Sequence, residues 1–153
     1  MGPSRRIGLR GIRFRNLSLG CAFGLVMAAS HVAAAQQVAA DAPPLSMDAA
    51  KALKSPIPST PDSVKNGRRL YQTHACANCH GVDGKALIEV VANATDLTDP
   101  SVWKNGTAEG QVFRSIRDGA GLAMPPFKTE VTAQDDLWHL VNFIRSLWPA
   151  DKR

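Results

Sequence analysis

Apolar side chains recur at helical spacing in three stretches of the chain, and the first stretch predicts a helix from residue 61 onward. Thr60 and Pro61 are typical of a helix start, because a threonine side chain accepts hydrogen bonds from free N–H groups and proline suits the first helical position. Val64, Leu70 and Tyr71 then follow on one face. We expect this helix to continue as far as the next cysteines.

The second stretch predicts a shorter helix in the middle of the chain. We expect Thr107 to cap its start and Gly119 to end it, since glycine readily adopts the left-handed conformation that closes a helix. Its apolar face holds Val112, Phe113 and Ile116.

The third stretch predicts the last helix, over residues 133–147, with Thr132 and Asp135 as a capping pair. Its apolar side chains are Leu137, Trp138, Leu140, Val141, Phe143, Ile144 and Leu147. The region before the second helix is mostly irregular, with a helical turn expected at 87–91 and a short helix at 100–103. No stretch has the alternation of a strand, so the sequence predicts a small all-α domain of three to four helices.

The first 35 residues are typical of a secretory signal peptide. Five arginines precede an apolar run at 17–29, and no acidic residue occurs before Asp41. Alanines at 33–35 offer a cleavage site, and the run is shorter than the roughly 20 residues that span a bilayer. An uncleaved membrane anchor is the alternative. We therefore expect a signal peptide (1–35), a flexible Ala/Pro-rich linker (36–60) and a folded domain (61–150).

The basic character of the chain comes from this leader. The 18 basic and 13 acidic residues give a net charge of +5, and all five basic residues of the leader are arginines. Without the leader 13 basic residues face 13 acidic ones, so the charge gives no reason to expect a nucleic-acid partner. Of the three cysteines, Cys21 lies in the leader, which leaves only Cys76 and Cys79.

Cys76, Cys79 and His80 form the motif C-x-x-C-H, by which a c-type haem is attached to a chain. Each cysteine sulfur adds to one vinyl group of the haem, and the histidine presents a neutral ring nitrogen to the iron. We therefore expect one haem c per chain. Two alternatives stay open: Cys76 and Cys79 as a redox dithiol, or as half of a structural zinc site. The first lacks the strand–helix–strand surroundings, and the second has only His74 nearby.

Met124 is the candidate for the second iron ligand. It lies in a loop with Pro125 and Pro126, which stiffen the chain around it. A thioether is a soft donor that favours ferrous iron and raises the potential relative to two histidines. A methionine is more often core filler, but the other methionine outside the leader, Met47, lies in the expected linker.

Residues 61–148 resemble the class I single-haem bacterial cytochromes c. The resemblance rests on C-x-x-C-H-G, on the downstream G-x-x-M-P loop and on the two terminal helices. In that family the first and last helices cross at small and aromatic residues, which correspond here to Gly67 and Tyr71, and to Leu140 and Phe143. The resemblance implies the cytochrome c fold around a covalently attached haem. The last helix is also similar to those of cytochromes that serve quinoprotein dehydrogenases and terminal oxidases.

One position departs from the family pattern. Family members usually have a proline whose carbonyl orients the proximal histidine, whereas Thr95 stands here and lacks the fixed proline φ. Its carbonyl can still accept the ring proton. Trp103 stands where the family often has an aromatic residue that binds a haem propionate, with core packing as the alternative. Arg114 and Arg117 are further propionate candidates or merely solvated charges, and we expect His139 at the surface.

The resemblance implies a periplasmic electron carrier that is not an enzyme, since His80 and Met124 together leave little room to activate oxygen. The expected partners are redox proteins in transient contact, a dehydrogenase or reductase donor and a terminal acceptor such as an oxidase. We expect a monomer, attached to a membrane only if the leader is retained. The alternative from another class is a haem-based small-ligand sensor or enzyme in which Met124 is labile.

Overall fold

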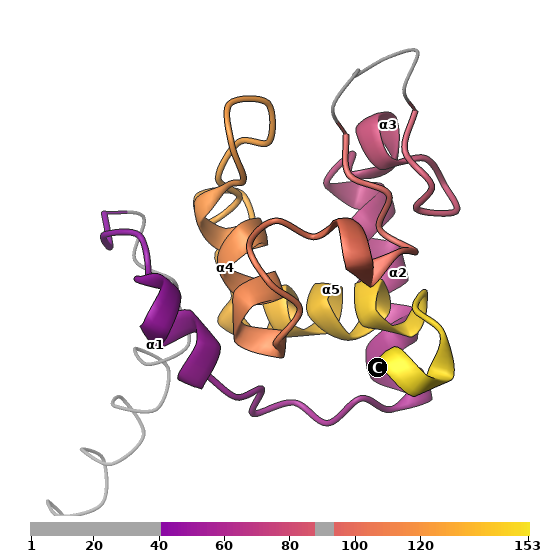
Figure 1. The fold of residues 1–153 in the computed structure, drawn as a ribbon, viewed down its shortest axis with the longest axis horizontal. Coiled ribbons are helices and arrows are strands. Elements are labelled where there is room, and N and C mark those ends of the chain that lie inside the picture. The colour runs from indigo at the N-terminus through magenta and orange to yellow at the C-terminus, as the bar shows by residue number, and fades with distance from the viewer. Residues whose placement is uncertain (1–40, 88–93) are drawn as a thin grey trace, which may run out of the picture.

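The polypeptide folds into helices that surround a single core (Figure 1). A computed structural model describes residues 41–87 and 94–153 of the chain. Its elements are α1 (Met47–Ala52), α2 (Pro61–Thr73), α3 (Ala77–His80), η2 (Pro100–Val102), α4 (Glu109–Asp118), α5 (Gln134–Ser146) and η3 (Ala150–Lys152), where η denotes a 3₁₀ turn. Over these residues only an isolated bridge between Ala120 and Met124 has strand-type pairing, which confirms the all-α prediction.

Helix α2 begins as its sequence predicts and ends earlier. The Ser63 N–H donates to the Thr60 hydroxyl over 3.2 Å, and Pro61 occupies the first helical position. The helix stops at Thr73 because Ala75 has a positive φ of 56°, which interrupts helical geometry. The prediction of one helix running into the cysteine motif is therefore wrong, and the motif has the separate helix α3.

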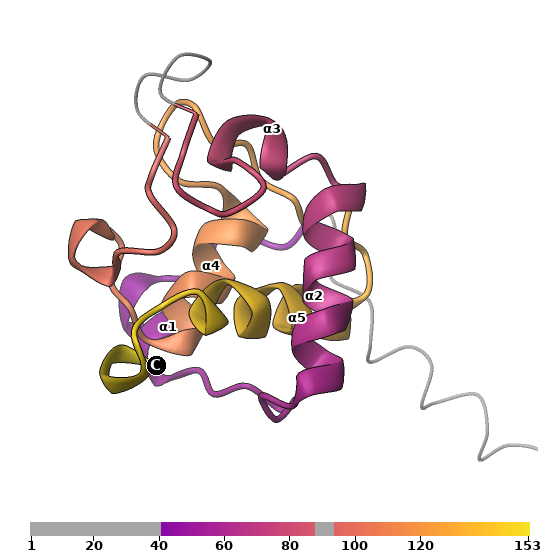
Figure 2. The ribbon, with the colours of Figure 1, turned by 90° about the vertical axis from the view of Figure 1, so that its right-hand side faces the viewer.

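Helices α2 and α5 cross in close contact (Figure 2). A side chain at Gly67 is excluded, since its Cβ would lie 2.0 Å from the His139 carbonyl oxygen and 2.6 Å from the Phe143 Cβ. Next to this contact the Tyr71 and Phe143 rings meet edge to face, with centroids 5.2 Å apart. The expected crossing at Gly67, Tyr71 and Phe143 is confirmed.

The core lies between α2, α4 and α5 and extends to the segments beside them. Trp148 also belongs to it, although no sequence pattern singled this residue out. Its side chain is buried, and its indole N–H donates to the Leu97 carbonyl over 2.8 Å. The buried apolar side chains of this cluster are Leu70, Tyr71, Leu97, Val112, Phe113, Ile116, Val131, Leu137, Trp138, Leu140, Val141, Phe143, Ile144 and Trp148.

Helices α4 and α5 start differently from the predictions. Ala108, not Thr107, precedes α4, and its N–H donates to the Gln111 side chain over 3.0 Å. Gly119 ends α4 with a φ of 83°, as expected. At α5 the residue before the helix is Ala133, which makes no side-chain capping bond, so the predicted pair of Thr132 and Asp135 does not form the cap.

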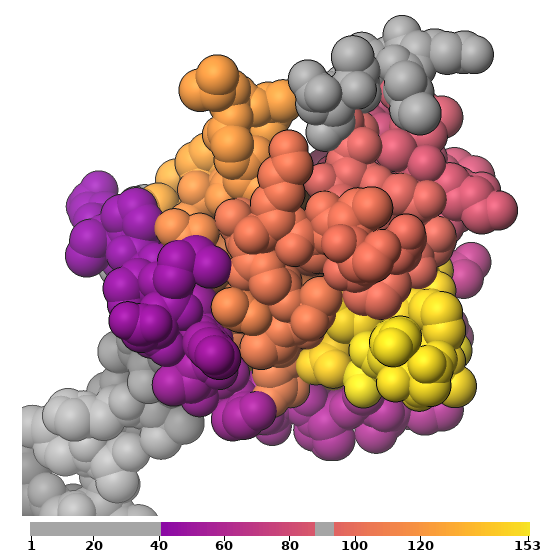
Figure 3. Space-filling model, viewed as in Figure 1, coloured from indigo at the N-terminus to yellow at the C-terminus, as the bar shows by residue number. Residues whose placement is uncertain are grey.

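Residues 41–60 pack onto the rest of the molecule instead of forming a loose linker. The Ser46 hydroxyl accepts from the Ala49 N–H over 3.1 Å and starts α1, whose Ala50 is fully buried against α4. A Cβ at Gly110 would lie 2.2 Å from the Ala50 carbonyl oxygen, so glycine is needed for this contact. Figure 3 shows α1 in indigo lying against the orange surface of α4. The prediction missed α1 because six residues are too few for an apolar period.

Two sequence predictions concern residues beyond the described ranges. Residues 1–40, with the expected signal peptide and Cys21, are outside them, and so is most of the expected helical turn at 87–91. Within 41–87 and 94–153 no helix has the length and apolar character required to cross a membrane.

Candidate functional site

The predicted site residues line one hollow of the molecule. A cavity of about 500 Å³ adjoins a smaller one of about 110 Å³, and both have Cys76, His80 and Met124 in their walls. Cys79 lines the smaller cavity and Trp103 the larger. The fold thus brings all five predicted side chains to the same place, although Cys76 and Met124 come from opposite halves of the domain.

His80 has a fixed ring orientation. The side chain is buried, and its Nδ1 lies 2.9 Å from the Thr95 carbonyl oxygen. Because a carbonyl only accepts, Nδ1 carries the proton, and Nε2 keeps the lone pair with which an imidazole binds a metal. The Tyr71 hydroxyl donates to the Gly81 carbonyl over 2.6 Å and holds the backbone next to this histidine. The Thr95 carbonyl therefore accepts the hydrogen bond from the His80 ring, although the proline of the family pattern is missing at this position.

Helix α3 fixes the spacing of the two cysteines. Cys76 precedes the helix and Cys79 lies within its single turn, where the His80 N–H donates to the Cys76 carbonyl over 3.0 Å. Burial raises the pKa of the Cys76 thiol to about 11. Reactive dithiols have a lowered thiol pKa, since the thiolate is the nucleophile. The surroundings of Cys76 therefore disfavour the dithiol alternative.

Met124 lies within a loop that begins where α4 ends and then folds back onto the last turn of that helix. The Ala120 N–H donates to the Met124 carbonyl over 3.1 Å, and the Phe127 N–H donates to the Ile116 carbonyl over 3.1 Å. A Cβ at Gly119 would lie 2.7 Å from the Met124 carbonyl oxygen, so the tight turn requires glycine. In Figures 1 and 2 this loop and α3 lie at the same end of the molecule.

Trp103 has a buried indole N–H without a hydrogen-bond partner among the residues that the structure describes. Its ring packs edge to face on Trp148, with centroids 5.6 Å apart, and lines the larger cavity. A buried N–H without an acceptor costs about 1–3 kcal/mol. An acceptor inside the cavity, such as a carboxylate of a bound group, would satisfy it.

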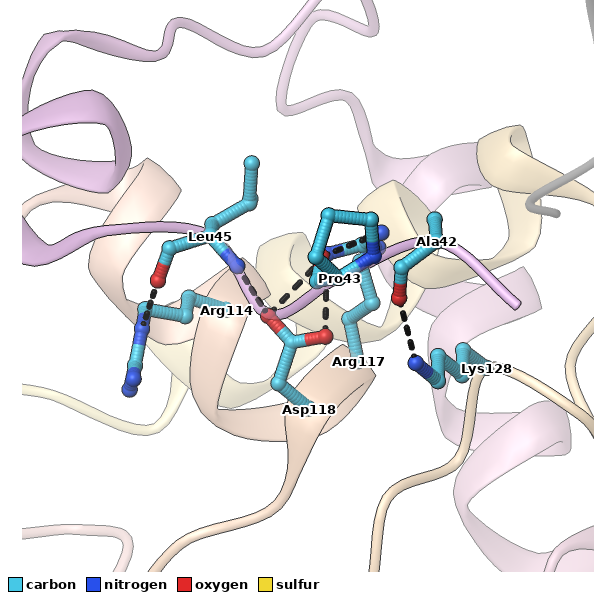
Figure 4. A network of polar contacts seen from close by, with 7 residues as sticks. All are labelled: Ala42, Pro43, Leu45, Arg114, Arg117, Asp118 and Lys128. Carbon is cyan, nitrogen blue, oxygen red and sulfur yellow. Dashed lines mark hydrogen bonds and ion pairs between the residues drawn. The ribbon is translucent and has the colours of Figure 1, made fainter. Parts of the chain in front are cut away.

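Three other candidates lie elsewhere. Arg114 and Arg117 turn away from the cavity toward residues 43–45: the Arg114 Nε donates to the Leu45 carbonyl over 2.6 Å, and Arg117 is buried beside Asp118 (Figure 4). Neither arginine lines the cavity, and both bind the backbone of residues 43–45 instead. His139 is half-buried at the helix crossing, where its Nδ1 lies 2.8 Å from the Ser63 hydroxyl, so the surface prediction for it is wrong.

The donor set and the cavity fit a haem. An imidazole and a thioether are axial ligands of cytochrome-type haem iron, and two cysteines in the same wall match thioether attachment. The volume of about 500 Å³ lies in the ordinary range of cofactor pockets. Nowhere in the described part of the chain do three or more His, Cys, Asp or Glu side chains gather as they do around a bare metal ion.

Residues 62–144, more than half of the chain, match the family profile described as cytochrome c oxidase, cbb3-type, subunit III. The chain belongs to this family of c-type cytochromes. It therefore binds haem c with its iron and has the fold and electron-transfer chemistry of a cytochrome c.

Individual relatives agree with this assignment. Cbb3-type cytochrome c oxidase subunit CcoP of Helicobacter pylori (strain 52) is 30% identical over 91 residues, which are 60% of this chain and 30% of that protein. The cytochrome domain thus spans only about 30% of the length of the curated relatives it matches.

Two solved structures are similar to this cytochrome. The crystal structure of cytochrome CL from the marine methylotroph Methylophaga aminisulfidivorans MPT has 27% identity and a TM-score of 0.52, and the match covers 61% of this chain and 63% of that one. A reducing HAO-like protein complex from Kuenenia stuttgartiensis contains a chain with 23% identity and a TM-score of 0.53, covering 65% of this chain and 49% of that one. At that identity the second match shows only a shared fold.

Proposed function

We propose that this cytochrome is a periplasmic single-haem carrier that passes single electrons between redox proteins and is not itself an enzyme. The observation that carries the proposal is the common cavity: Cys76, Cys79, His80 and Met124 line it together, and the Thr95 carbonyl sets the tautomer of His80.

The chain's residues have separate roles in this proposal. Cys76 and Cys79 would hold the haem by two thioether bonds, and His80 and Met124 would bind the iron. The haem supplies an iron that alternates between the ferrous and ferric states. Thr95 holds the His80 ring, and Trp103 would donate its N–H to a propionate. A carrier needs ligands that stay in place in both oxidation states, which the closed loop around Met124 favours.

The partners and location belong to the same proposal. The curated relatives are oxidase subunits by name, which supports an oxidase among the acceptors. The arginine-rich leader with its apolar run supports export. A dehydrogenase or reductase would be the donor, and the contacts would be small and transient, as is usual for redox encounters. We expect the carrier to be monomeric.

The visible spectrum of the periplasmic protein, before and after acid–acetone extraction, tests this function. We expect the haem to stay with the chain, the oxidised form to show the far-red methionine–iron band, and carbon monoxide to leave the reduced spectrum unchanged. Met124→Leu should abolish the band and let carbon monoxide bind. Met47→Leu, at the exposed methionine in α1, is the matched control and should change neither property.

Each contrary outcome points to one alternative. Haem that extracts from the chain would contradict covalent attachment and favour the dithiol. Haem that stays without the far-red band, together with carbon monoxide binding to the unaltered protein, would favour a sensor or enzyme in which Met124 is labile.

A further inference from the structure

The segment before α1 is bound by the cationic side chains of Arg114 and Arg117 in α4 and of Lys128 (Figure 4). Lys128 Nζ donates to the Ala42 carbonyl over 2.6 Å, and the Arg117 guanidinium lies 3.4 Å from the Pro43 carbonyl oxygen. Arg114 Nε donates to the Leu45 carbonyl over 2.6 Å. We call residues 42–45 the strap.

The strap also donates to an acidic residue. The Leu45 N–H donates to Asp118 Oδ2 over 2.9 Å, and the same carboxylate accepts from Arg117 over 2.9 and 3.0 Å. The side chains of Arg117 and Asp118 are only 8% and 2% exposed. A buried ion pair needs further hydrogen bonds to offset the loss of water, and the strap supplies them to both partners.

These contacts surround the base of the loop that carries Met124. Asp118 is the last residue of α4 and stands directly before the loop, and Lys128 stands directly after it. The two ends are joined by the Lys128 N–H, which donates to the Arg117 carbonyl over 3.1 Å. The strap therefore binds both ends of the same nine-residue loop, 119–127, through different side chains.

The strap is itself held in place further along the chain. Leu45 and Leu53 pack against the core, and Ala50 between them is fully buried on α4. Since α1 lies against the first turn of α4 and the strap against its last, residues 42–53 cover the whole length of that helix. The loop base thus rests on a segment that is anchored independently of it.

We propose that the strap fixes the loop as a ligand-holding element, with Asp118 and Lys128 as positioning residues for Met124. The proposal rests on the function proposed above, because Met124 must be the iron ligand. It assigns a role to a segment outside the matched region, residues 62–144. When the strap contacts are removed, the loop opens more often and Met124 leaves the iron more often.

The rate at which imidazole replaces Met124 in the oxidised haem protein tests the strap. The variants are Asp118→Asn and Lys128→Met, and the rate is followed by loss of the far-red band at 25 °C. We expect each variant to raise the rate about tenfold, since Lys128→Met removes the hydrogen bond to the Ala42 carbonyl and Asp118→Asn removes the charge of the carboxylate that accepts from the Leu45 N–H and from Arg117. The matched controls are Asp151→Asn and Lys152→Met, an exposed ion pair far from the loop, and they should leave the rate unchanged.

Helical circular dichroism, recorded on the same samples, separates positioning from general stability. We expect all four variants to be fully folded at 25 °C, so that a faster rate reports the loop alone. If Asp118→Asn and Lys128→Met are folded and exchange at the rate of their controls, the strap proposal is wrong. If the unaltered protein lacks the far-red band, the proposed function fails first, because Met124 is then not the ligand.

Discussion

At the scale of single residues, Trp103 and Trp138 differ in whether the side chain lines the cavity. The N–H groups of Trp103 and Trp138 are both buried and without a partner in the described part of the protein, but only Trp103 lines the cavity. Trp138 instead stacks on Phe113, with ring centroids 4.2 Å apart. Trp103 thus has a possible acceptor in a bound haem, and Trp138 has none there.

Trp103→Phe should lower the reduction potential of the haem. Without the N–H, a propionate keeps its full negative charge, and this charge stabilises the ferric form. A hydrogen bond of about 1 kcal/mol corresponds to roughly 40 mV for one electron, so we expect a drop of about 20 mV or more in a spectroelectrochemical titration. Trp138→Phe should leave the potential unchanged. Equal shifts in the two variants would contradict the propionate contact.

Tyr71 gives the domain a pH dependence in the alkaline range. Burial raises the pKa of its phenol well above the usual range. The unfolded chain loses this proton near pH 10, while the folded chain keeps it. The contribution of Tyr71 to the free energy of unfolding is therefore fully present below about pH 10. Above that pH the free energy of unfolding falls by at most about 1.4 kcal/mol per pH unit.

Urea unfolding of the haem protein between pH 8 and 11 measures this loss. Tyr71→Phe should lower the free energy of unfolding at pH 8 by about 1 kcal/mol, because the hydrogen bond to the Gly81 carbonyl is lost. Above pH 10 the free energy of unfolding of this variant should fall less steeply with pH than that of the unaltered protein. Because Tyr71 is the only tyrosine, tyrosinate absorbance reports on it alone. Ionisation near pH 10 in the folded protein would contradict its burial.

At the scale of elements, α1 depends on one small side chain. Ala50 is fully buried against α4, while its neighbour Ala49 is exposed. Ala50→Leu should push α1 away from α4, at a cost of about 1–3 kcal/mol for overpacking. Ala49→Leu adds the same atoms on the solvent side and is the matched control.

Limited proteolysis of the folded protein measures the displacement. We expect cleavage within residues 41–60 to be about tenfold or more faster in Ala50→Leu than in Ala49→Leu, because the open form is more populated. Equal cleavage rates would mean that α1 is not held by this contact.

At the scale of the whole molecule, the cavity makes the fold dependent on its cofactor. With Cys76→Ser and Cys79→Ser together, haem is no longer attached, and the cavity of about 500 Å³ stays without it. Core side chains such as Leu97 and Ile144 then lose the group that covers them, at about 25 cal/mol for each Å² of apolar surface exposed, against a total stability of about 5–15 kcal/mol for a small domain.

We therefore expect the double variant to lose its near-ultraviolet circular dichroism and its cooperative urea transition. Cys21→Ser should keep both, since the leader is predicted to be removed. A double variant that unfolds as cooperatively as the haem protein would contradict the dependence of the fold on bound haem.

The sequence predicted those parts of the molecule whose chemistry is local. The caps of α2 at Thr60 and of α4 at Gly119 follow from single residues, and the spacing of Cys76 and Cys79 follows from attachment chemistry. The strap could not be predicted from the sequence. Arg114, Arg117 and Lys128 donate to backbone carbonyls, and because every residue has a carbonyl, such contacts leave no pattern of side chains in the sequence. The only sequence signal for α1 was Ser46 before an alanine-rich stretch.

The crossing of α2 and α5 has a consequence for the order of events during synthesis. The Asn142 side chain donates to the carbonyls of Ile57 and Pro58 and to the Ser63 hydroxyl, groups made some 80 residues earlier. The helix that closes the core is therefore the last to be made. Until it arrives, the segment with Cys76 and Cys79 lies in an unfinished chain, open to whatever enzyme joins it to haem. The order of the helices along the chain thus allows the cysteine segment to be reached before the core closes.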